Sequence, residues 1–386
     1  MREIAYHSYR SERTVTVRCT VEPASGAVSA EGYGTATTEA VARKKALSEA
    51  VERLMACTPF SLVARPPTTH TCRGTDSRHW SGGVRGAPEG CLLRAYEPLT
   101  ADRPRQVPLF WSSPWVAGLE LRSSTLTAQA ARLSCTVGWA ASPSPEAALR
   151  NALFELAELL NYSAFLYRCL TRPPGHVPED GDAARSGQVD DGSSTPLTLP
   201  IGYVARTPTV LAVSRSAGRL MPATGIGSGS TQTEAADRAL LELAQAETLW
   251  RENTTAESAE RYFMRRFERW PLLRRCAALE FDLQADDLPH HNEPLPSPLQ
   301  ELESRGISVW ADSGAVDISG PGMERTRIHY AHVVSDPQPL LGLVRAGIPV
   351  FDTGEVRKTL DWSRRTGPAV HSPSQRSTHG GCPAGA

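Results

Sequence analysis

The chain of 386 residues carries 41 basic and 42 acidic side chains, which gives a formal net charge of −1. This balance predicts neither an overall basic field that would attract nucleic acid nor an acidic tail. No apolar run approaches the ~20 residues that a membrane-spanning helix requires, and residues 1–13 are too polar for a signal peptide. We therefore expect a cytosolic protein with no membrane and no nucleic-acid partner.

The eight cysteines form no C-x-x-C pair, which is typical of free thiols in a reducing compartment. Four residues of types that bind zinc lie near one another in the sequence, namely His70, Cys72, His79 and Cys91. Their spacing matches no compact zinc motif, so a zinc site is the weaker interpretation of this segment.

The first of three similar segments spans residues 15–56. A strand is predicted by the alternating apolar residues Val15, Val17, Cys19 and Val21. Gly32 and Gly34 then predict a tight turn, and a helix is expected from about Thr37. The helix has an apolar stripe at the spacing of a core-facing surface, made of Leu47, Ala50, Val51 and Leu54.

The second segment spans residues 132–162, where an extended stretch is again expected to lead to a glycine, Gly138, and then to a helix. Ser144 is the expected N-cap, and Pro145 stands at the first helical position, where proline is favoured. The apolar stripe of this helix consists of Leu149, Leu153, Leu156 and Leu160.

The third segment spans residues 210–250, and Thr231 and Glu234 have the spacing of a capping box at the start of its helix. Three strand–turn–helix units joined by long segments predict an α+β fold with helices packed on mixed β-sheet. The units are too unevenly spaced for a solenoid.

Residues 65–90 and 172–196 are rich in proline, glycine and polar residues, which predicts surface loops that act as lids or linkers. Short apolar runs within residues 304–352 predict further strands. We expect one domain over residues 1–363 and a disordered tail over residues 364–386.

Each predicted helix carries polar side chains three or four residues apart, and therefore on one face. They are Glu49, Glu52, Glu155, Glu158, Arg238, Glu242 and Gln245. Two like charges ~5 Å apart repel by roughly 3 kcal/mol at an effective dielectric constant of 20, so several converging pairs need a cation. Carboxylates suit Mg²⁺ and arginine suits phosphate, which predicts a nucleoside-triphosphate site without a P-loop. Solvated carboxylates on separate surface helices would give the same local pattern.

In this order the three segments resemble the motifs of YcaO proteins. The first is GYG followed by EAVER, the second is VGWAASPSPEAALRNALFELAEL, and the third is RALLELAQ. The resemblance covers roughly residues 15–250. It implies the YcaO fold and an enzyme that uses ATP to phosphorylate an amide oxygen of a peptide. A nucleophile then attacks the same carbon, which yields an azoline, a thioamide or an amidine.

Carried over by position, the resemblance implies that Mg²⁺ is held by Glu49, Glu52, Glu155, Glu158 and Glu242. ATP would be bound by Glu49, Glu155, Arg238 and Gln245. The catalytic residue and the nucleophile are not assigned. The expected partners are a precursor peptide and a protein that binds its leader or donates sulfur, and a homodimer is one of the oligomeric states left open.

Four positions depart from the family pattern at the expected nucleotide site, namely Tyr33, Lys45, Val137 and Leu159. A non-catalytic YcaO-like protein that binds precursor peptide or an active YcaO enzyme is therefore the alternative function. A third interpretation is an RNA-binding module, because Arg43, Lys44 and Lys45 follow a glycine-containing strand as in a double-stranded-RNA-binding domain. The other two segments lack this basic cluster, which argues against it.

Overall fold

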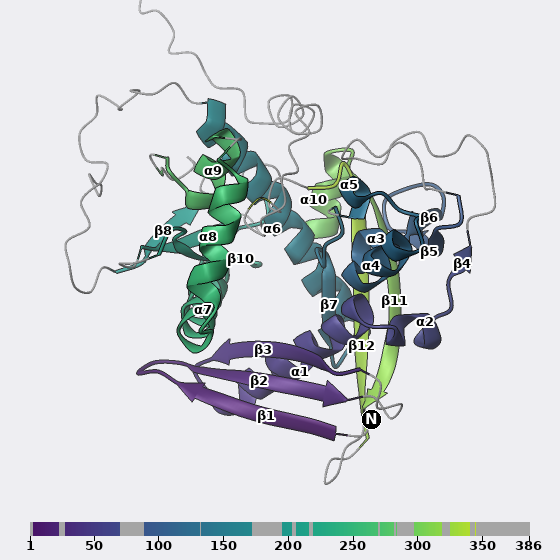
Figure 1. The fold of residues 1–386 in the computed structure, drawn as a ribbon, viewed down its shortest axis with the longest axis horizontal. Coiled ribbons are helices and arrows are strands. Elements are labelled where there is room, and N and C mark those ends of the chain that lie inside the picture. The colour runs from purple at the N-terminus through teal and green to yellow at the C-terminus, as the bar shows by residue number, and fades with distance from the viewer. Residues whose placement is uncertain are drawn as a thin grey trace, which may run out of the picture.

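Figure 1 shows the computed structural model of the chain. The described residues are 3–22, 28–69, 89–131, 133–171, 195–202, 206–215, 219–268, 271–281, 283, 297–318, 325–339 and 344. The central parts of both expected surface loops, the apolar run at 348–351 and the expected tail lie outside these residues, as do His70, Cys72 and His79.

The N-terminal unit is a three-stranded antiparallel sheet covered on one face by a helix (Figure 1). Its strands are β1 (Glu3–Arg10), β2 (Val15–Glu22) and β3 (Ala30–Ala36), in that order across the sheet. The helix is α1 (Glu39–Cys57), which packs on β2 and β3. Alternate residues of β2 face α1, as the sequence pattern predicts, because strand side chains alternate between the two faces.

A second three-stranded antiparallel sheet repeats this arrangement later in the chain. Its strands are β8 (Leu197–Pro200), β9 (Thr209–Ser214) and β10 (Ala223–Ser228), and β9 lies in the middle. Helix α7 (Gln232–Glu252) packs on β9 and β10. It is followed by α8 (Ala256–Arg266) and α9 (Pro271–Ala278).

A six-stranded sheet lies beside these two units. Its strands are β4 (Thr68–Thr69), β5 (Leu92–Pro98), β6 (Arg105–Pro108), β7 (Trp139–Ser142), β11 (Ser308–Ile318) and β12 (Thr326–Asp336). The long helix α6 (Pro145–Thr171) and α10 (Pro298–Ser304) pack against it. The shorter helices are α2 (Phe60–Ala64), α3 (Leu109–Ser112), α4 (Pro114–Arg122) and α5 (Ala128–Ala131).

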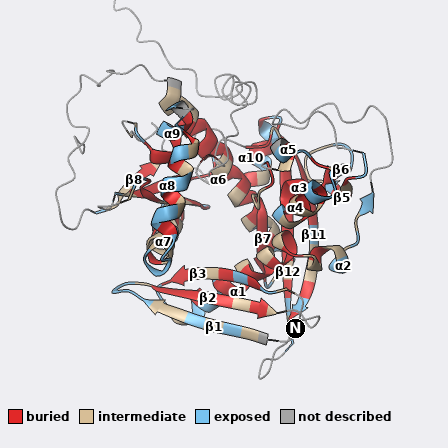
Figure 2. Cartoon of the chain, viewed as in Figure 1, coloured by how far each residue is buried: buried red, intermediate tan, exposed pale blue. Residues whose placement is uncertain are grey.

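The α+β fold class is confirmed, and every strand pair among the described residues is antiparallel. The predicted stripe of α1 is buried, and so is that of α6 except for the half-buried Leu149. Figure 2 shows buried residues along both helices. Ser144 accepts a hydrogen bond from the Ala147 N–H at 3.2 Å, as expected of an N-cap. None of the helices in the described ranges is long and apolar enough to cross a membrane.

The prediction of a tight turn at Gly32 and Gly34 is wrong, because both residues lie inside strand β3. A Cβ atom added to Gly32 would overlap the backbone of Ala46 and Ala50 in α1. Because glycine has no side chain, the strand can pack closely against the helix. The sequence pattern of two glycines does not distinguish this arrangement from a turn.

The second segment also differs from its prediction, because its strand β7 follows Gly138 instead of preceding it. Gly138 itself is the expected turn residue, with a φ of 81°. A Cβ atom there would collide with the Val333 carbonyl oxygen of β12. Two of the three segments are thus structural equivalents, and the segment with α6 is not.

Candidate functional site

The two three-stranded units correspond position by position with an offset of 193 residues. In the first, the hydroxyls of Thr16 and Thr35 form a buried hydrogen bond of 2.8 Å. In the second, the hydroxyls of Thr209 and Ser228 form the same bond at 2.8 Å. The correspondence extends to the strand–helix contact, because Gly225 meets α7 as Gly32 meets α1. The residues of α1 and α7 can therefore be compared directly.

Each unit directs one glutamate of its helix to the free edge of its own sheet. The backbone N–H of Tyr33 donates to Glu49 Oε2 at 3.0 Å, and the N–H of Ile226 donates to Glu242 Oε2 at 2.8 Å. β3 and β10 are edge strands among the described residues, so these N–H groups have no neighbouring strand to bind. The hydrogen bonds give these two backbone N–H groups an acceptor and fix both carboxylates in place.

The second glutamate of α1 reaches a different sheet. Glu52 Oε1 accepts a hydrogen bond from the Ala141 N–H of β7 at 2.7 Å. Burial, together with the negative charge of Glu49, raises the pKa of Glu52 to about 8. Near neutral pH this side chain is therefore mostly protonated unless a cation approaches it.

Helix α6 adds two more carboxylates between the units. Burial raises the pKa of Glu155 well above its usual value, and the charges of Glu52 and Glu242 raise it further. Burial and the charges of Glu242 and Glu155 do the same to Glu158. The backbone N–H groups of Gly138 and Ser228 donate to Glu155 and Glu158 respectively. The fold thus brings together the predicted glutamates of α1, α6 and α7.

The cationic and amide side chains of the predicted site lie at the same place. Arg238 Nη2 donates to Glu234 Oε1 at 2.7 Å, and its guanidinium lies 5.3 Å from the centre of the Phe154 ring on α6. The positive charge of Arg238 partly offsets the raised pKa of Glu158. Gln245 Oε1 accepts a hydrogen bond from the Thr35 hydroxyl at 3.2 Å, which joins α7 to β3.

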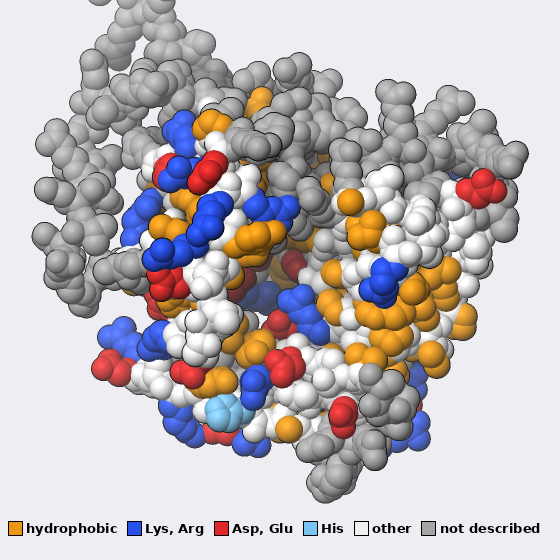
Figure 3. Space-filling view, in the orientation of Figure 1, with side chains coloured by type: hydrophobic (Ala, Val, Ile, Leu, Met, Phe, Trp, Pro, Cys, Tyr) orange, Lys and Arg blue, Asp and Glu red, His pale blue; other side chains and the backbone are white. Residues whose placement is uncertain are grey.

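The molecular surface is hollowed between α7 and β7, and acidic and basic side chains gather there (Figure 3). Within the described ranges, no three His, Cys, Asp or Glu residues are close enough to enclose a metal ion by themselves. Neighbouring carboxylates that raise one another's pKa nevertheless form a donor set that a divalent cation would stabilise. Mg²⁺ commonly takes only one or two protein carboxylates and completes its shell with water and phosphate oxygens, so the residues fit such an ion.

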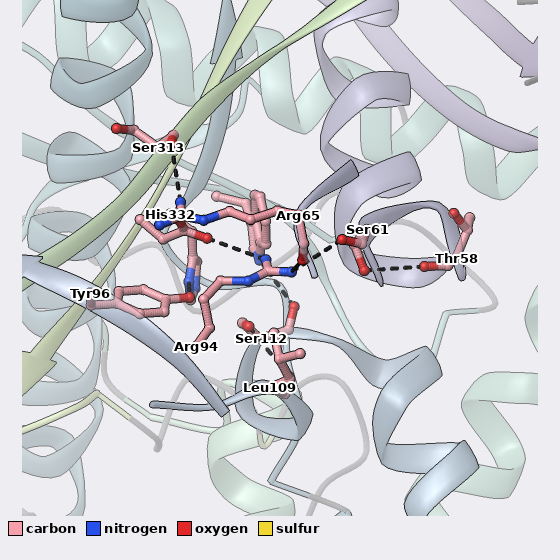
Figure 4. A network of polar contacts seen from close by, with 11 residues as sticks. Thr58, Ser61, Arg65, Arg94, Tyr96, Leu109, Ser112, Ser313 and His332 are labelled. Carbon is pink, nitrogen blue, oxygen red and sulfur yellow. Dashed lines mark hydrogen bonds and ion pairs between the residues drawn. The ribbon is translucent and has the colours of Figure 1, made fainter. Parts of the chain in front are cut away.

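A buried polar network beside the site was not foreseen from the sequence. The Tyr96 hydroxyl donates to His332 Nδ1 at 2.5 Å, and His332 Nε2 donates to the Val137 carbonyl at 3.0 Å (Figure 4). Burial lowers the pKa of His332 to about 3, so the ring is neutral, in agreement with these roles. Val137 precedes Gly138, whose N–H binds Glu155, and the network therefore supports the turn that positions this carboxylate.

The same network contains a buried ion pair between β5 and β11. Arg94 Nη1 lies 3.2 Å from Asp312 Oδ2, and the two side chains are 2% and 0% exposed. Arg65 also pairs with Asp312, while Arg94 Nη2 donates to the carbonyls of Ser61 and Arg65 (Figure 4). Nothing in the local sequence signals these contacts, because their partners lie far apart along the chain.

The positions that depart from the family pattern have distinct environments. Tyr33 offers the site its backbone N–H, while its hydroxyl donates to Glu31 Oε2 at 3.2 Å. Val137 contributes its carbonyl to the network around His332. Lys45 Nζ donates to the Thr35 carbonyl at 3.1 Å, and Leu159 is half-buried.

A family model described as YcaO cyclodehydratase, ATP- and Mg²⁺-binding, matches residues 32–334. The solved structure of YcaO from Methanopyrus kandleri, bound with AMPPCP and Mg²⁺, is 18% identical with a TM-score of 0.54. Its alignment covers 90% of this chain and 87% of that one. The E. coli microcin synthetase McbBCD complex with pro-MccB17 bound is 14% identical with a TM-score of 0.51, covering 86% and 87%. At these identities the likeness shows the fold alone. A comparison with curated protein sequences finds no match.

Proposed function

The chain belongs to the YcaO family, whose cofactors are ATP and Mg²⁺, and we propose that it modifies the backbone of a ribosomally made precursor peptide. The observation that carries this proposal is the convergence on one place of half-buried glutamates from α1 and α6 with the exposed Glu242 of α7. A structural role does not account for it, because clustered carboxylates that raise one another's pKa destabilise the fold when they ionise, unless a cation compensates them.

In this proposal the side chains bind and orient the reactants. Mg²⁺, when bound, would neutralise phosphate charge. Mg²⁺ would take one or two of its ligands from the carboxylates proposed for this role, which are Glu49, Glu52, Glu155, Glu158 and Glu242. Arg238, Gln245 and the backbone-anchored Glu49 and Glu155 are proposed to position the nucleotide. Arg238 is held by Glu234 and packs over Phe154, so its guanidinium is ordered before a phosphate arrives.

The proposed reaction transfers the terminal phosphoryl group of ATP to a peptide amide oxygen and releases ADP. A nucleophile then adds to the amide carbon, and the oxygen leaves as phosphate. A cysteine, serine or threonine side chain would give an azoline, sulfide a thioamide, and an amine an amidine. The site supports this class of reaction through charge neutralisation and positioning, which are the main resources of phosphoryl transfer.

The proposed partners are the precursor peptide and a protein that presents its leader or supplies sulfur. The solved microcin synthetase is a multi-protein complex with pro-MccB17 bound, which supports a peptide substrate and partner proteins for this chain. The RNA-binding alternative gains no support from the start of α1. Arg43 pairs there with Glu39 at 2.7 Å, and Lys45 binds the Thr35 carbonyl, so the basic side chains are engaged separately.

Isothermal titration of the purified chain with ATP, in the presence and absence of Mg²⁺, tests the proposed function. We expect saturable binding that depends on Mg²⁺ and weakens strongly in Glu158→Gln. Glu252→Gln is the matched control, because Glu252 is exposed at the end of α7. No binding of Mg-ATP by the native chain would overturn the enzyme proposal. It would favour the alternative, a non-catalytic partner of a precursor peptide or an active YcaO enzyme.

A further inference from the structure

Lys45 lies on the face of α1 that carries the acidic site residues. Glu49 and Glu52 follow it by four and seven residues, which is the spacing of one helix face. Lys45 is an exposed residue as a whole, but the end of its side chain is partly enclosed, where its Nζ donates to the Thr35 carbonyl on the edge strand β3. The Lys45 side chain therefore extends from α1 toward the edge of strand β3, which borders the site.

The residue equivalent to Lys45 in the second unit is Arg238, at the same offset of 193 residues. The local packing shows the correspondence directly. A Cβ atom added to Gly34 would lie against the Cβ of Lys45, and one added to Gly227 would lie against the Cβ of Arg238. Both side chains thus leave their helices at the same point, beside the second glycine of the adjoining edge strand.

The two cations approach the same edge strand, because Lys45 binds the Thr35 carbonyl of β3 and α7, which carries Arg238, also contacts β3. Burial, followed by the positive charge of Arg238, lowers the pKa of Lys45. Arg238 is paired with Glu234, whereas no ion pair among the described residues includes Lys45. Glu49, one helical turn away, is instead engaged by Arg53 and by the Tyr33 N–H. A ligand with several negative charges would relieve this repulsion and give Lys45 a partner.

We propose that Lys45 and Arg238 form a two-sided clamp for the phosphate chain of a nucleoside triphosphate, one cation from each unit, which rests on the ATP-dependent function proposed above. Arginine can hold phosphate oxygens through a forked pair of hydrogen bonds, and lysine binds them as a point charge. The carboxylates on the same helix faces would then lie near the phosphates, where they could hold a Mg²⁺ ion. The clamp selects for the number of phosphates, and the base of the nucleotide plays no part in it.

Calorimetric titration of the full chain with ATP and with AMP, both in the presence of Mg²⁺, tests the clamp. Lys45→Gln is the decisive variant, because glutamine can still donate to the Thr35 carbonyl while the charge is lost. We expect it to weaken ATP binding about tenfold or more, as loss of a charged hydrogen bond does, and to change AMP binding little. Lys45→Arg is expected to restore ATP affinity. Lys44→Ala, at the exposed neighbouring position, is expected to leave both affinities unchanged.

The outcomes separate the clamp from the proposed function. Native binding of Mg-ATP together with unchanged binding by Lys45→Gln overturns the clamp and leaves the proposed function standing. An equal loss of ATP and AMP affinity also overturns it, because that result indicates a structural role for Lys45. If the native chain binds no Mg-ATP, the clamp and the proposed function fail together.

Discussion

Glu49 and Glu242 are structural equivalents separated by 193 residues, and each accepts a hydrogen bond from the backbone N–H of the residue sixteen positions before it. The donors, Tyr33 and Ile226, stand between the two glycines of edge strands β3 and β10. The glycines let each helix approach its strand closely enough for this contact. Two halves of one site are therefore built by the same local design, and α6 completes the site from between them.

The carboxylate cluster makes the stability of the apo-protein depend on pH. The pKa of Glu52 rises from 4.5 to about 8 on folding, and those of Glu155 and Glu158 also rise. At pH values between the unfolded-state and folded-state pKa, the folded state binds more protons than the unfolded state. The free energy of unfolding therefore falls as pH increases. We expect the Tm, measured by scanning calorimetry, to decrease between pH 5 and pH 8.

Magnesium provides the control for this pH dependence. In the proposed function Mg²⁺ binds the ionised carboxylates, and we therefore expect it to raise the Tm more at pH 8 than at pH 5. Glu52→Gln removes one of the titrating groups and should flatten the pH dependence in the absence of Mg²⁺. A Tm that is independent of pH in this window would contradict the ionisation behaviour described for the cluster.

Loss of Glu52 or Arg238 should abolish ATP turnover and leave the fold intact. In Glu52→Gln the amide oxygen can still accept the hydrogen bond from Ala141, so only the charge is removed. Arg238→Ala removes the cation proposed to bind phosphate. Turnover is measured as phosphate release from Mg-ATP, and circular dichroism checks the fold. Arg251→Ala serves as the control for Arg238, since Arg251 is exposed near the end of α7. Unchanged turnover in both site variants would refute the site assignment.

Gly32→Ala should destabilise the N-terminal unit, because the added methyl group would overlap the backbone of α1. Overpacking of this kind costs about 1–3 kcal/mol, or more where the backbone must move. Gly118→Ala in α4 is the matched control. Its new Cβ would lie 3.7 Å from the nearest atom, on a flexible arginine, so we expect up to about 1 kcal/mol of stabilisation from helix propensity. Urea unfolding measures both, and equal effects would contradict the close packing of β3 on α1.

Asp312→Asn should be strongly destabilising, because it leaves Arg94 buried with an uncompensated charge. Breaking a buried ion pair from one side typically costs about 3–5 kcal/mol. Asp317→Asn on the same strand β11 is the control. Its partner Arg325 is 74% exposed, and a surface pair contributes about 1 kcal/mol or less. The free energy of unfolding is measured for both variants, and a small loss in Asp312→Asn would show that water compensates Arg94.

The sequence predicts the elements of this fold wherever the signal is local. The strand at β2, the buried stripes of α1 and α6 and the N-cap at Ser144 follow from residues two to four positions apart. The strands β11 and β12 were likewise expected from short apolar runs. At the end of the second sheet, Thr231 accepts from the Glu234 N–H as predicted, but the Glu234 side chain accepts from Ser230 instead of closing the capping box.

The glycine pairs show where local patterns are ambiguous. A Gly-x-Gly sequence before a helix fits a tight turn, and it fits equally well a strand that must lie against that helix. Only the position of α1 over Gly32 and Gly34 distinguishes the two. For the same reason the sequence pattern predicts three equivalent segments, whereas only two are equivalent in the structure. In the third, the strand follows the Gly138 turn instead of preceding it.

The sequence by itself determined the helix faces, the order of the motifs and the acidic residue types that the site uses. Tertiary structure alone decided that the charges of Glu52 and Glu242 raise the pKa of Glu155. It also decided that Lys45 is the counterpart of Arg238. The support that Tyr96 and His332 give to the Gly138 turn likewise arises only on folding. The physical reason is distance along the chain. Helix periodicity is set by neighbours a few residues apart, whereas burial, charge repulsion and the pKa of a carboxylate depend on groups that only folding brings together.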